Sequence, residues 1–166
     1  ITVSPDGRNV YATPRDSSSL TTFRRNRKTG ALTQLGAGKG CTSDAALPRC
    51  TTGRALGGAD VVEISPNGNN VYVGSFIESA VAVFNRNRKT GVLTQPADTT
   101  GCLTEVATTG CSTGIALGSP EGMAVSPDGT SVYVATAASN AVVVLVRDTS
   151  TGALTQASDG SGCIVN

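Results

Sequence analysis

The chain has 166 residues, with 13 Lys or Arg, 12 Asp or Glu and no His, so its formal charge is +1. This length suits one domain, the near-neutral charge argues against nucleic-acid binding, and the longest apolar run, at 141–146, is too short to span a membrane. Without His, neither a Ser-His-Asp nor a Cys-His mechanism can be built from this chain alone. The chain has no initiator Met and no signal peptide, so we expect it to be mature, processed or cut from something longer.

A Ser-Pro-Asp/Asn-Gly turn occurs three times at a constant spacing, at 4–7, 65–68 and 126–129. A Val-Tyr pair and a Thr-Gly-Ala/Val-Leu-Thr-Gln segment recur with the same spacing of 61 residues. The chain is therefore an internal repeat. It is divided into three units, expected at 1–60, 61–121 and 122–166.

Each unit is expected to hold four short strands, because β-branched runs alternate with turns rich in Pro, Gly and Asn. These strands are predicted near 1–3, 9–13, 19–24 and 31–34, then 60–64, 71–73, 80–84 and 92–95, then 122–125, 131–135, 141–147 and 153–156. No segment has an amphipathic helical period. Four antiparallel strands per unit are typical of one propeller blade. The predicted fold is therefore an all-β propeller segment of three four-stranded antiparallel blades.

The rest of each unit is interpreted as a long connection to the next blade, and it carries cysteines. The simplest assignment is two local disulfides, Cys41–Cys50 and Cys102–Cys111, although other pairings stay open. Disulfides favour an oxidising compartment, so we predict an extracellular or cell-surface protein. Nine-residue cysteine gaps without His fit zinc poorly, so neither a metal nor a cofactor is expected.

The fifth cysteine, Cys163, is in phase with the first member of each pair. Its partner would lie beyond residue 166, so we expect Cys163 to be unpaired because the third loop is incomplete; an intermolecular disulfide is the alternative. Both chain ends fall inside a unit, and three blades would leave two apolar outer faces. We therefore expect further blades, either in a larger propeller or from associated copies.

The motif Val-Ser-Pro-Asp-Gly-x-x-Val-Tyr-Val-Ala at 125–135 resembles the YVTN-type β-propeller repeats. The Asn-Ala-Val segment at 140–142, the Arg-Asp-x-x-Thr-Gly-Ala-Leu-Thr-Gln segment at 147–156 and the Gly-Cys…Cys…Gly-x-Ala-Leu connection at 101–117 are similar to lactonase-type propellers of actinobacteria and related bacteria. The resemblance implies the propeller fold and, as an alternative function, 6-phosphogluconolactonase-like hydrolysis of a sugar lactone. No catalytic motif of that family maps onto a numbered residue here.

Three arginines recur in phase, Arg25, Arg86 and Arg147, each followed by Asn or Asp. One hypothesis is that they form a ring of guanidinium groups that binds an anionic sugar acid or a lactone. The other, which we favour, is that the Asn or Asp caps a turn while the arginine reaches a neighbouring carboxylate or carbonyl.

Residues that break the repeat are better catalytic candidates. These are Arg15, Asp16, Glu63 and Glu78. A lactonase needs a carboxylate or a metal to activate water and a positive group for the developing oxyanion, and these residue types can supply both.

All the strong signals in the sequence are structural. The primary prediction is therefore an extracellular binding, scaffold or self-assembling surface module, with the lactonase-like hydrolase as the alternative. Expected partners are other blades of the same protein, further copies of the chain, or a carbohydrate or cell-surface ligand. Neither nucleic acid nor a membrane span is expected.

Overall fold

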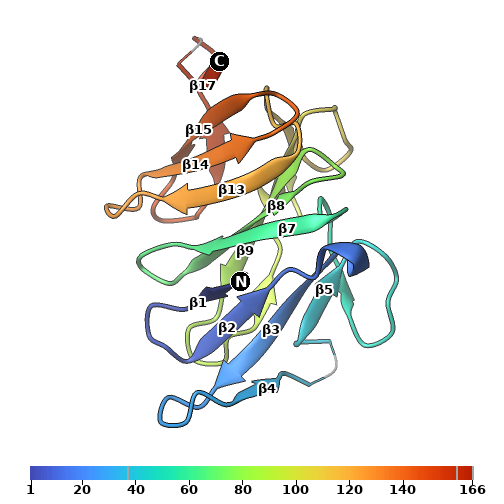
Figure 1. Cartoon of the computed structure of the whole chain (residues 1–166), viewed down its shortest axis with the longest axis vertical. Helices are drawn as coiled ribbons and strands as arrows, with labels where there is room; N and C mark the ends of the chain where they lie inside the picture. The colour runs from blue at the N-terminus through green and yellow to red at the C-terminus, as the bar shows by residue number, and fades with distance from the viewer. Residues whose placement is uncertain (37, 160, 166) are drawn as a thin grey trace.

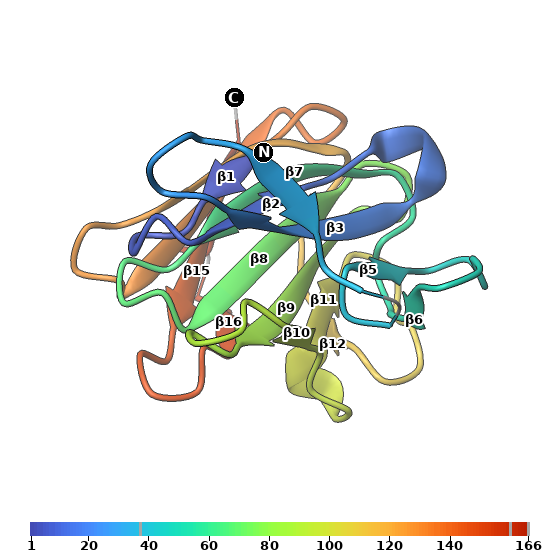
Figure 2. The same cartoon turned by 90° about the horizontal axis from the view of Figure 1, so that it is seen from below.

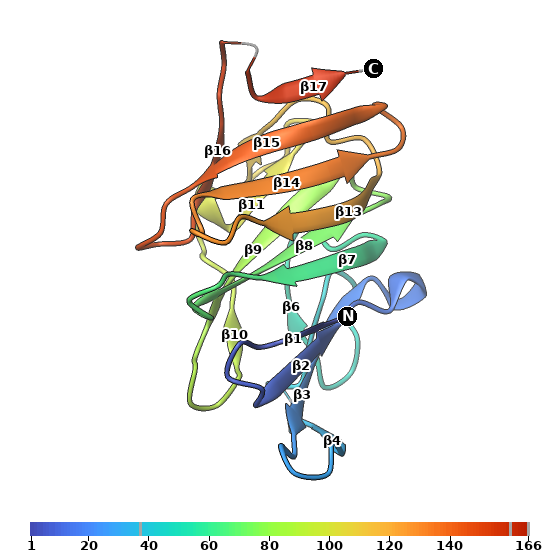
Figure 3. The ribbon, with the colours of Figure 1, turned by 60° about the vertical axis from the view of Figure 1, so that its left-hand side comes forward.

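The computed structural model describes residues 1–36, 38–159 and 161–165, which form three twisted sheets stacked along the long axis (Figures 1 and 3). The first sheet contains β1 (Thr2–Val3), β2 (Asn9–Ala12), β3 (Ser19–Arg25), β4 (Leu32–Gln34), β5 (Cys41–Ser43) and β6 (Thr51–Thr52). The second contains β7 (Ala59–Ile64), β8 (Asn70–Ser75), β9 (Ala80–Arg86), β10 (Leu93–Thr94), β11 (Cys102–Thr104) and β12 (Ser112–Thr113). The third contains β13 (Pro120–Val125), β14 (Ser131–Thr136), β15 (Ala141–Arg147), β16 (Leu154–Gln156) and β17 (Cys163–Val165).

The helical segments of the described chain are two short 3₁₀ turns, η1 (Arg15–Ser17) and η2 (Thr99–Gly101). Seen along the stack, successive sheets are rotated relative to one another (Figure 2). The all-β architecture predicted from the sequence, a partial propeller, is confirmed. No helix among the described residues is long and apolar enough to cross a membrane.

The first three strands of each sheet form an antiparallel meander, set by the repeated Ser-Pro-x-Gly turn. In the second sheet the Gly68 amide donates to the Ser65 carbonyl at 2.8 Å, and the Ser65 hydroxyl accepts from the Asn70 amide at 3.0 Å. Gly68 has a φ of +71°, which glycine adopts without steric cost. The turn fixes the register, so Ile64 lies opposite Val71.

The outer edge of each blade differs from the four-strand prediction. The second half of β3 pairs with β4 (Phe23 with Gln34), and its first half pairs with β5 (Thr21 with Cys41), so two short pieces share the fourth position. β6 then adds in parallel to β5, and the second sheet repeats this arrangement. The long connection, for which the sequence predicted no strand, therefore extends the blade. Pieces of two or three residues are too short for periodicity to reveal.

Both predicted disulfides are formed. Cys41–Cys50 has an S–S distance of 2.02 Å and Cα atoms 4.6 Å apart, and Cys102–Cys111 repeats it one blade later. Each joins the first residue of β5 or β11 to the residue before the parallel edge strand, and thereby holds that strand in place. Cys163 is free and half-buried in β17. Two disulfides indicate an oxidising environment, such as the extracellular space or the periplasm.

The hydrophobic core lies between the sheets rather than within one of them. One cluster joins Tyr11 and Leu20 of the first sheet to the second sheet, through residues that include Val62, Val73 and Phe84. The other cluster joins the opposite face of the second sheet to the third sheet, with members Tyr72, Val81, Val83, Leu103, Leu117, Val132, Val134, Val143, Leu145 and Leu154. The middle blade is thus covered on both faces.

Candidate functional site

Two of the repeated arginines are buried where neighbouring blades meet. Arg86 is 6% exposed, and its guanidinium reaches into the preceding blade. Nε donates to the Tyr11 hydroxyl at 2.7 Å and Nη2 to Oδ1 of Asn9 at 2.8 Å, while Nη1 donates to the Gly68 carbonyl of its own blade at 3.0 Å. We call this set of contacts the latch, because it joins two blades through one side chain.

The latch occurs again one blade later. Arg147 is 3% exposed; Nε donates to the Tyr72 hydroxyl at 2.5 Å, and Nη2 to Oδ1 of Asn70 at 2.7 Å. Nη1 donates to the Gly129 carbonyl at 2.8 Å. Buried charges need this kind of complete hydrogen bonding, because desolvation is otherwise expensive.

Each latch tyrosine is inserted between two groups of the following blade. The Tyr11 hydroxyl accepts from Arg86 and donates to the Gly91 carbonyl at 2.9 Å. Burial raises the pKa of Tyr11 to about 12, although Arg86 opposes the shift. Gly91 has a φ of +79°, and a Cβ there would lie 2.1 Å from Nδ2 of Asn9. Glycine is therefore required both by the turn and by the approach of the preceding blade.

Asp6 completes the first latch with an ion pair: Nη2 of Arg86 lies 3.0 Å from its carboxylate. Burial alone would raise the pKa of Asp6, but hydrogen bonds from the Ser4 hydroxyl, the Arg8 amide and Arg86 outweigh it and lower the pKa from 3.8 to about 2. Because the folded pKa is depressed, this contribution to stability is present above pH 3.8 and is lost as the pH falls through about 2.

We predict that Asp6→Asn lowers the free energy of unfolding above pH 3.8, and that the difference from the unmodified protein vanishes as the pH falls through about 2. Urea unfolding across this pH range measures it. Asp128→Asn is the matched control, because Asp128 accepts the equivalent hydrogen bonds from the Ser126 hydroxyl and the Thr130 amide, with one more from the Thr130 hydroxyl, but meets no arginine in the described part of the chain. Equal losses in the two variants would contradict a role for Arg86.

These contacts favour a blade-joining role for Arg86 and Arg147. Arg25 differs, because it is half-buried and, among the described residues, its Nη1 donates only to the Gly7 carbonyl of its own blade, at 3.3 Å. Anion binding by the three arginines together remains a prediction.

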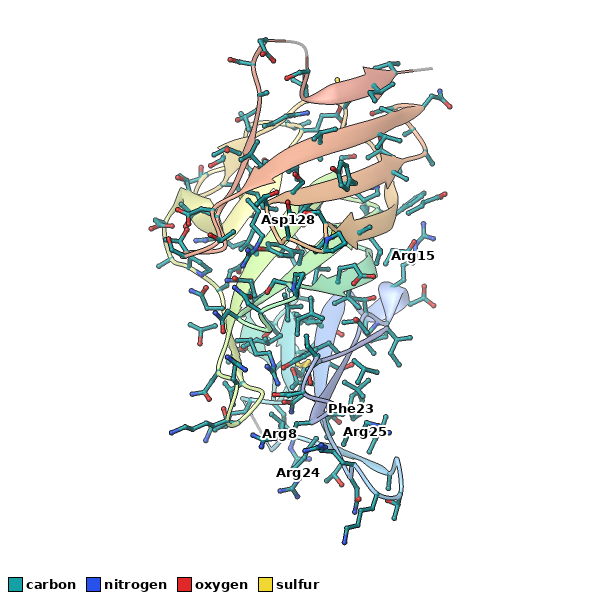
Figure 4. The ribbon with its side chains drawn as sticks, turned by 90° about the vertical axis from the view of Figure 1, so that its left-hand side faces the viewer. Arg8, Arg15, Phe23, Arg24, Arg25 and Asp128 are labelled. Atoms are coloured by element: carbon teal, nitrogen blue, oxygen red, sulfur yellow. A yellow bond between two sulfur atoms is a disulfide. The ribbon has the colours of Figure 1, made fainter. Side chains whose placement is uncertain are left out.

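The candidates that break the repeat lie elsewhere, mostly on the rim that carries the turns between the second and third strands. Arg15, in η1 of the first blade, lies over the second blade (Figure 4). Its Nη1 is 3.8 Å from the Asp60 carboxylate, and its guanidinium carbon lies 3.7 Å from the centre of the Phe76 ring. A cation over an aromatic face is attracted by the ring quadrupole. Arg15 is thus oriented but still 42% exposed, so it can meet a ligand.

Glu78 is carried by the same turn as Phe76, and its Oε2 accepts from the Gly57 amide at 2.9 Å. The equivalent residue of the third blade, Ser139, accepts from Gly118 in the same way at 3.0 Å. The backbone therefore needs an acceptor here but not a carboxylate. Burial raises the pKa of Glu78 above 4.5; the Gly57 hydrogen bond opposes this, and the adjacent Asp44 carboxylate adds to it. A carboxylate with a raised pKa is better suited to general acid–base chemistry near neutral pH.

Glu63 lies away from the turn that carries Phe76 and Glu78. Glu63 pairs with Tyr72, next to the Ser-Pro-Asn-Gly turn, whereas the Phe76 turn follows the opposite end of β8. On β7, Glu63 lies three positions from Asp60, about 10 Å at the usual strand rise. Asp16 is exposed in η1. The candidate site, called the rim group below, is Arg15 with its partners Asp60 and Phe76, together with Glu78, which follows Phe76 by two residues on the same turn.

Asp60 and Phe76 could not be recognised as site residues from the sequence, because each meets Arg15 across a blade boundary. The η1 turn of the first blade lies over the first strand of the second blade. A single sequence does not show how far one blade is shifted relative to the next. The available signal is the repeat itself: Arg15 and Phe76 hold the same position in successive units. Within the described residues, no cluster of three or more His, Cys, Asp or Glu is placed to hold a metal ion.

Comparison with known families assigns the fold. Residues 42–162 match the family described as Lactonase, 7-bladed beta-propeller, and this match covers well over half of the chain. The chain belongs to this lactonase family. The three sheets are thus blades of a lactonase-family propeller. No curated protein matches the chain.

Solved structures agree with the lactonase-family fold. A candidate 6-phosphogluconolactonase from Bacteroides uniformis is similar to this chain with a TM-score of 0.71 and 24% identity, over 99% of this chain and 39% of that one. A candidate 6-phosphogluconolactonase from Bacteroides fragilis is similar with a TM-score of 0.72 and 23% identity, over 99% of this chain and 38% of that one. The periplasmic gluconolactonase PpgL of Pseudomonas aeruginosa is similar with a TM-score of 0.64 and 22% identity, over 93% of this chain and 37% of that one. The lactonase-family chain therefore spans less than two fifths of these structures, and at such identities they show the fold alone.

Proposed function

We propose that this chain contributes three blades to a propeller that hydrolyses a sugar lactone, and that the rim group takes part in the reaction. The family supports a lactonase more than the binding or scaffold module that the sequence favoured, so the hydrolase becomes the leading proposal. The observation that carries the proposal is the placement of an exposed guanidinium and a carboxylate of raised pKa around one turn.

The chemistry assigned to the rim group is ester hydrolysis. The ionised Glu78 carboxylate takes a proton from water as the water oxygen bonds to the lactone carbonyl carbon. The Arg15 guanidinium, oriented by Asp60 and Phe76, stabilises the negative charge that develops on the carbonyl oxygen. When the bond from that carbon to the ring oxygen breaks, protonated Glu78 returns the proton to the leaving oxygen, and the product is an open-chain hydroxy acid.

The test is hydrolysis of glucono-δ-lactone and its 6-phosphate, followed as acid release above the spontaneous rate. Glu78→Gln keeps the acceptor for Gly57 and removes the base, so we expect kcat/KM to fall about 100-fold with an unchanged fold. Glu63→Gln is the matched control, because it is the same substitution in the same blade but away from the rim group, and it should change kcat/KM less than about twofold.

The pH profile gives an independent readout. Loss of the Glu78 proton switches the base on, so kcat should fall as the pH drops below its raised pKa, and this limb should disappear in Glu78→Gln. The proposal fails if the unmodified protein hydrolyses neither lactone above background. The role of Glu78 fails if Glu78→Gln and Glu63→Gln are equally active.

A further inference from the structure

The charges of the chain are divided between the two rims of the stack. The Ser-Pro-x-Gly turns and the turns between the third and fourth strands share one rim, at 4–9, 65–70, 126–131, 24–31, 85–92 and 146–153. These six segments hold nine of the 13 Lys and Arg but only three of the 12 Asp and Glu. The rest of the chain, which includes the rim group on the opposite rim, holds the other four and nine. The formal charge of +1 therefore conceals a strong separation of charge.

Six cations of this rim are exposed and have no carboxylate partner. We call them the basic rim: Arg8, Arg24, Arg27, Lys28, Arg88 and Lys89. Among the described residues the ion pairs are Arg15 with Asp60 and Arg86 with Asp6, and neither includes a member of the basic rim. Figure 4 shows Arg8 and Arg24 on one side of the stack and Arg15 on the other. Charges of one sign gathered on one surface attract ligands of the opposite sign.

The exposure of the basic rim is a property of the repeat and does not depend on the chain ends. Arg88 and Lys89 are exposed although the first blade packs against the second. Their equivalents in the first unit are Arg27 and Lys28, so a preceding blade would leave these side chains exposed as well. The position of Arg8 is exposed in all three units.

A groove of about 420 Å³ lies on this rim between the turns of the first and second blades. It is lined by Asp6, Arg8, Arg88 and Lys89. Asp6 is already paired with Arg86, which itself lines an adjoining hollow of about 190 Å³. The groove therefore has a positive charge after this pairing, and its cations come from both blades. An anionic chain placed in it can contact the two blades at once.

We propose that the basic rim binds a linear polyanion, a polymer that carries a phosphate on each unit and no bases. Cations spread over two blades can meet several phosphates of one chain, and such multivalent contacts bind far more tightly than a single phosphate does. The six turn segments contain no aromatic residue, the type on which nucleic-acid bases stack and which anchors a protein in a bilayer interface.

The third blade limits the extent of this surface. Its turns on the same rim carry the exposed Asp128 and Asp148, and Arg147 is buried in its latch. The polymer is therefore expected to follow the first two blades. Because the rim group lies on the opposite rim, this binding is independent of the proposed lactone hydrolysis.

Fluorescence anisotropy of end-labelled, long-chain inorganic polyphosphate, titrated with the 166-residue chain, tests this proposal. We expect a dissociation constant of about 10 µM at low salt. A plot of log affinity against log salt concentration should have a slope of about −4 if all six cations engage, because each contact releases a condensed counterion. Orthophosphate at the same total phosphate concentration should not displace the polymer, since it makes no multivalent contact.

Substitutions locate the binding surface. Lys89→Gln should raise the dissociation constant about fivefold, and the double variant Arg8→Gln, Arg88→Gln, which removes a cation from each side of the groove, about 25-fold. Lys39→Gln is the matched control: it neutralises an exposed lysine outside the six turns and should change the dissociation constant less than about 1.5-fold. Circular dichroism and the urea midpoint establish that each variant is folded.

Three results would overturn the proposal. The first is no binding of polyphosphate at low salt. The second is an equal loss of affinity in Lys39→Gln and Lys89→Gln, which would show that only net charge matters. The third is tighter binding, at equal phosphate concentration, to phosphatidylglycerol vesicles or to single-stranded DNA, which would assign the surface to a membrane or to a nucleic acid.

Discussion

Replacing Arg86 by Met should lower the free energy of unfolding by about 3–5 kcal/mol, the usual cost of removing one member of a buried, hydrogen-bonded charge pair. The loss is large because acceptors in two blades depend on one guanidinium: Tyr11 and Asn9 in the first, and Gly68 in the second. Met retains much of the apolar stem, so the measurement reports mainly the polar contacts. Urea unfolding at neutral pH gives the value.

Arg88→Met is the control for Arg86→Met. Arg88 lies two residues along the same chain segment but is exposed, so its replacement should change stability by less than about 0.5 kcal/mol. If both variants lose the same stability, the effect comes from charge or from the turn, and the latch does not hold the blades together.

Replacing Phe84 by Ala should cost about 3–5 kcal/mol, because it leaves a cavity in the cluster between the first and second blades. Phe84 is fully buried in β9. The repeat offers a natural comparison, since Leu145 holds the equivalent, fully buried position in the third blade. Phe84→Leu should therefore cost less than about 1.5 kcal/mol.

Phe23→Ala tests whether burial between blades is the cause. Phe23 has the same place in the first blade but is only half-buried, because no described blade covers that face. Its replacement should cost clearly less than that of Phe84 in the same urea experiment. A similar loss at both positions would show that packing within a blade, and not between blades, stabilises the fold.

Much of the fold could be predicted because turn chemistry fixes it. A strand was expected at 141–147, and β15 runs from Ala141 to Arg147; the Ser-Pro-x-Gly turns likewise placed the first two strands of each unit within about two residues. The split outer strand was not predictable. The strand expected at 31–34 is present as β4 (Leu32–Gln34), but β5 (Cys41–Ser43), which shares its position beside β3, was missed because three residues are too short to show an alternating pattern.

The contacts of the rim group needed the three-dimensional arrangement. Arg15 was a candidate because it breaks the repeat, but the residues that orient it belong to the next blade. Arg86 was expected to reach a carboxylate or a carbonyl, and it contacts both. The Asp6 carboxylate, however, lies 80 residues away in sequence. A single sequence shows which residues repeat, and it does not show which unit each of them contacts.

A double-mutant cycle between Tyr11 and Arg86 tests most directly the claim that the blades of this lactonase-family chain are joined by the latch. The unfolding free energies of the unmodified protein, Tyr11→Phe, Arg86→Met and the double variant are measured in urea. If the hydroxyl and the guanidinium stabilise each other across the blade boundary, the coupling energy should be at least about 1 kcal/mol. A coupling below about 0.3 kcal/mol would mean that the two losses are independent and would contradict the latch.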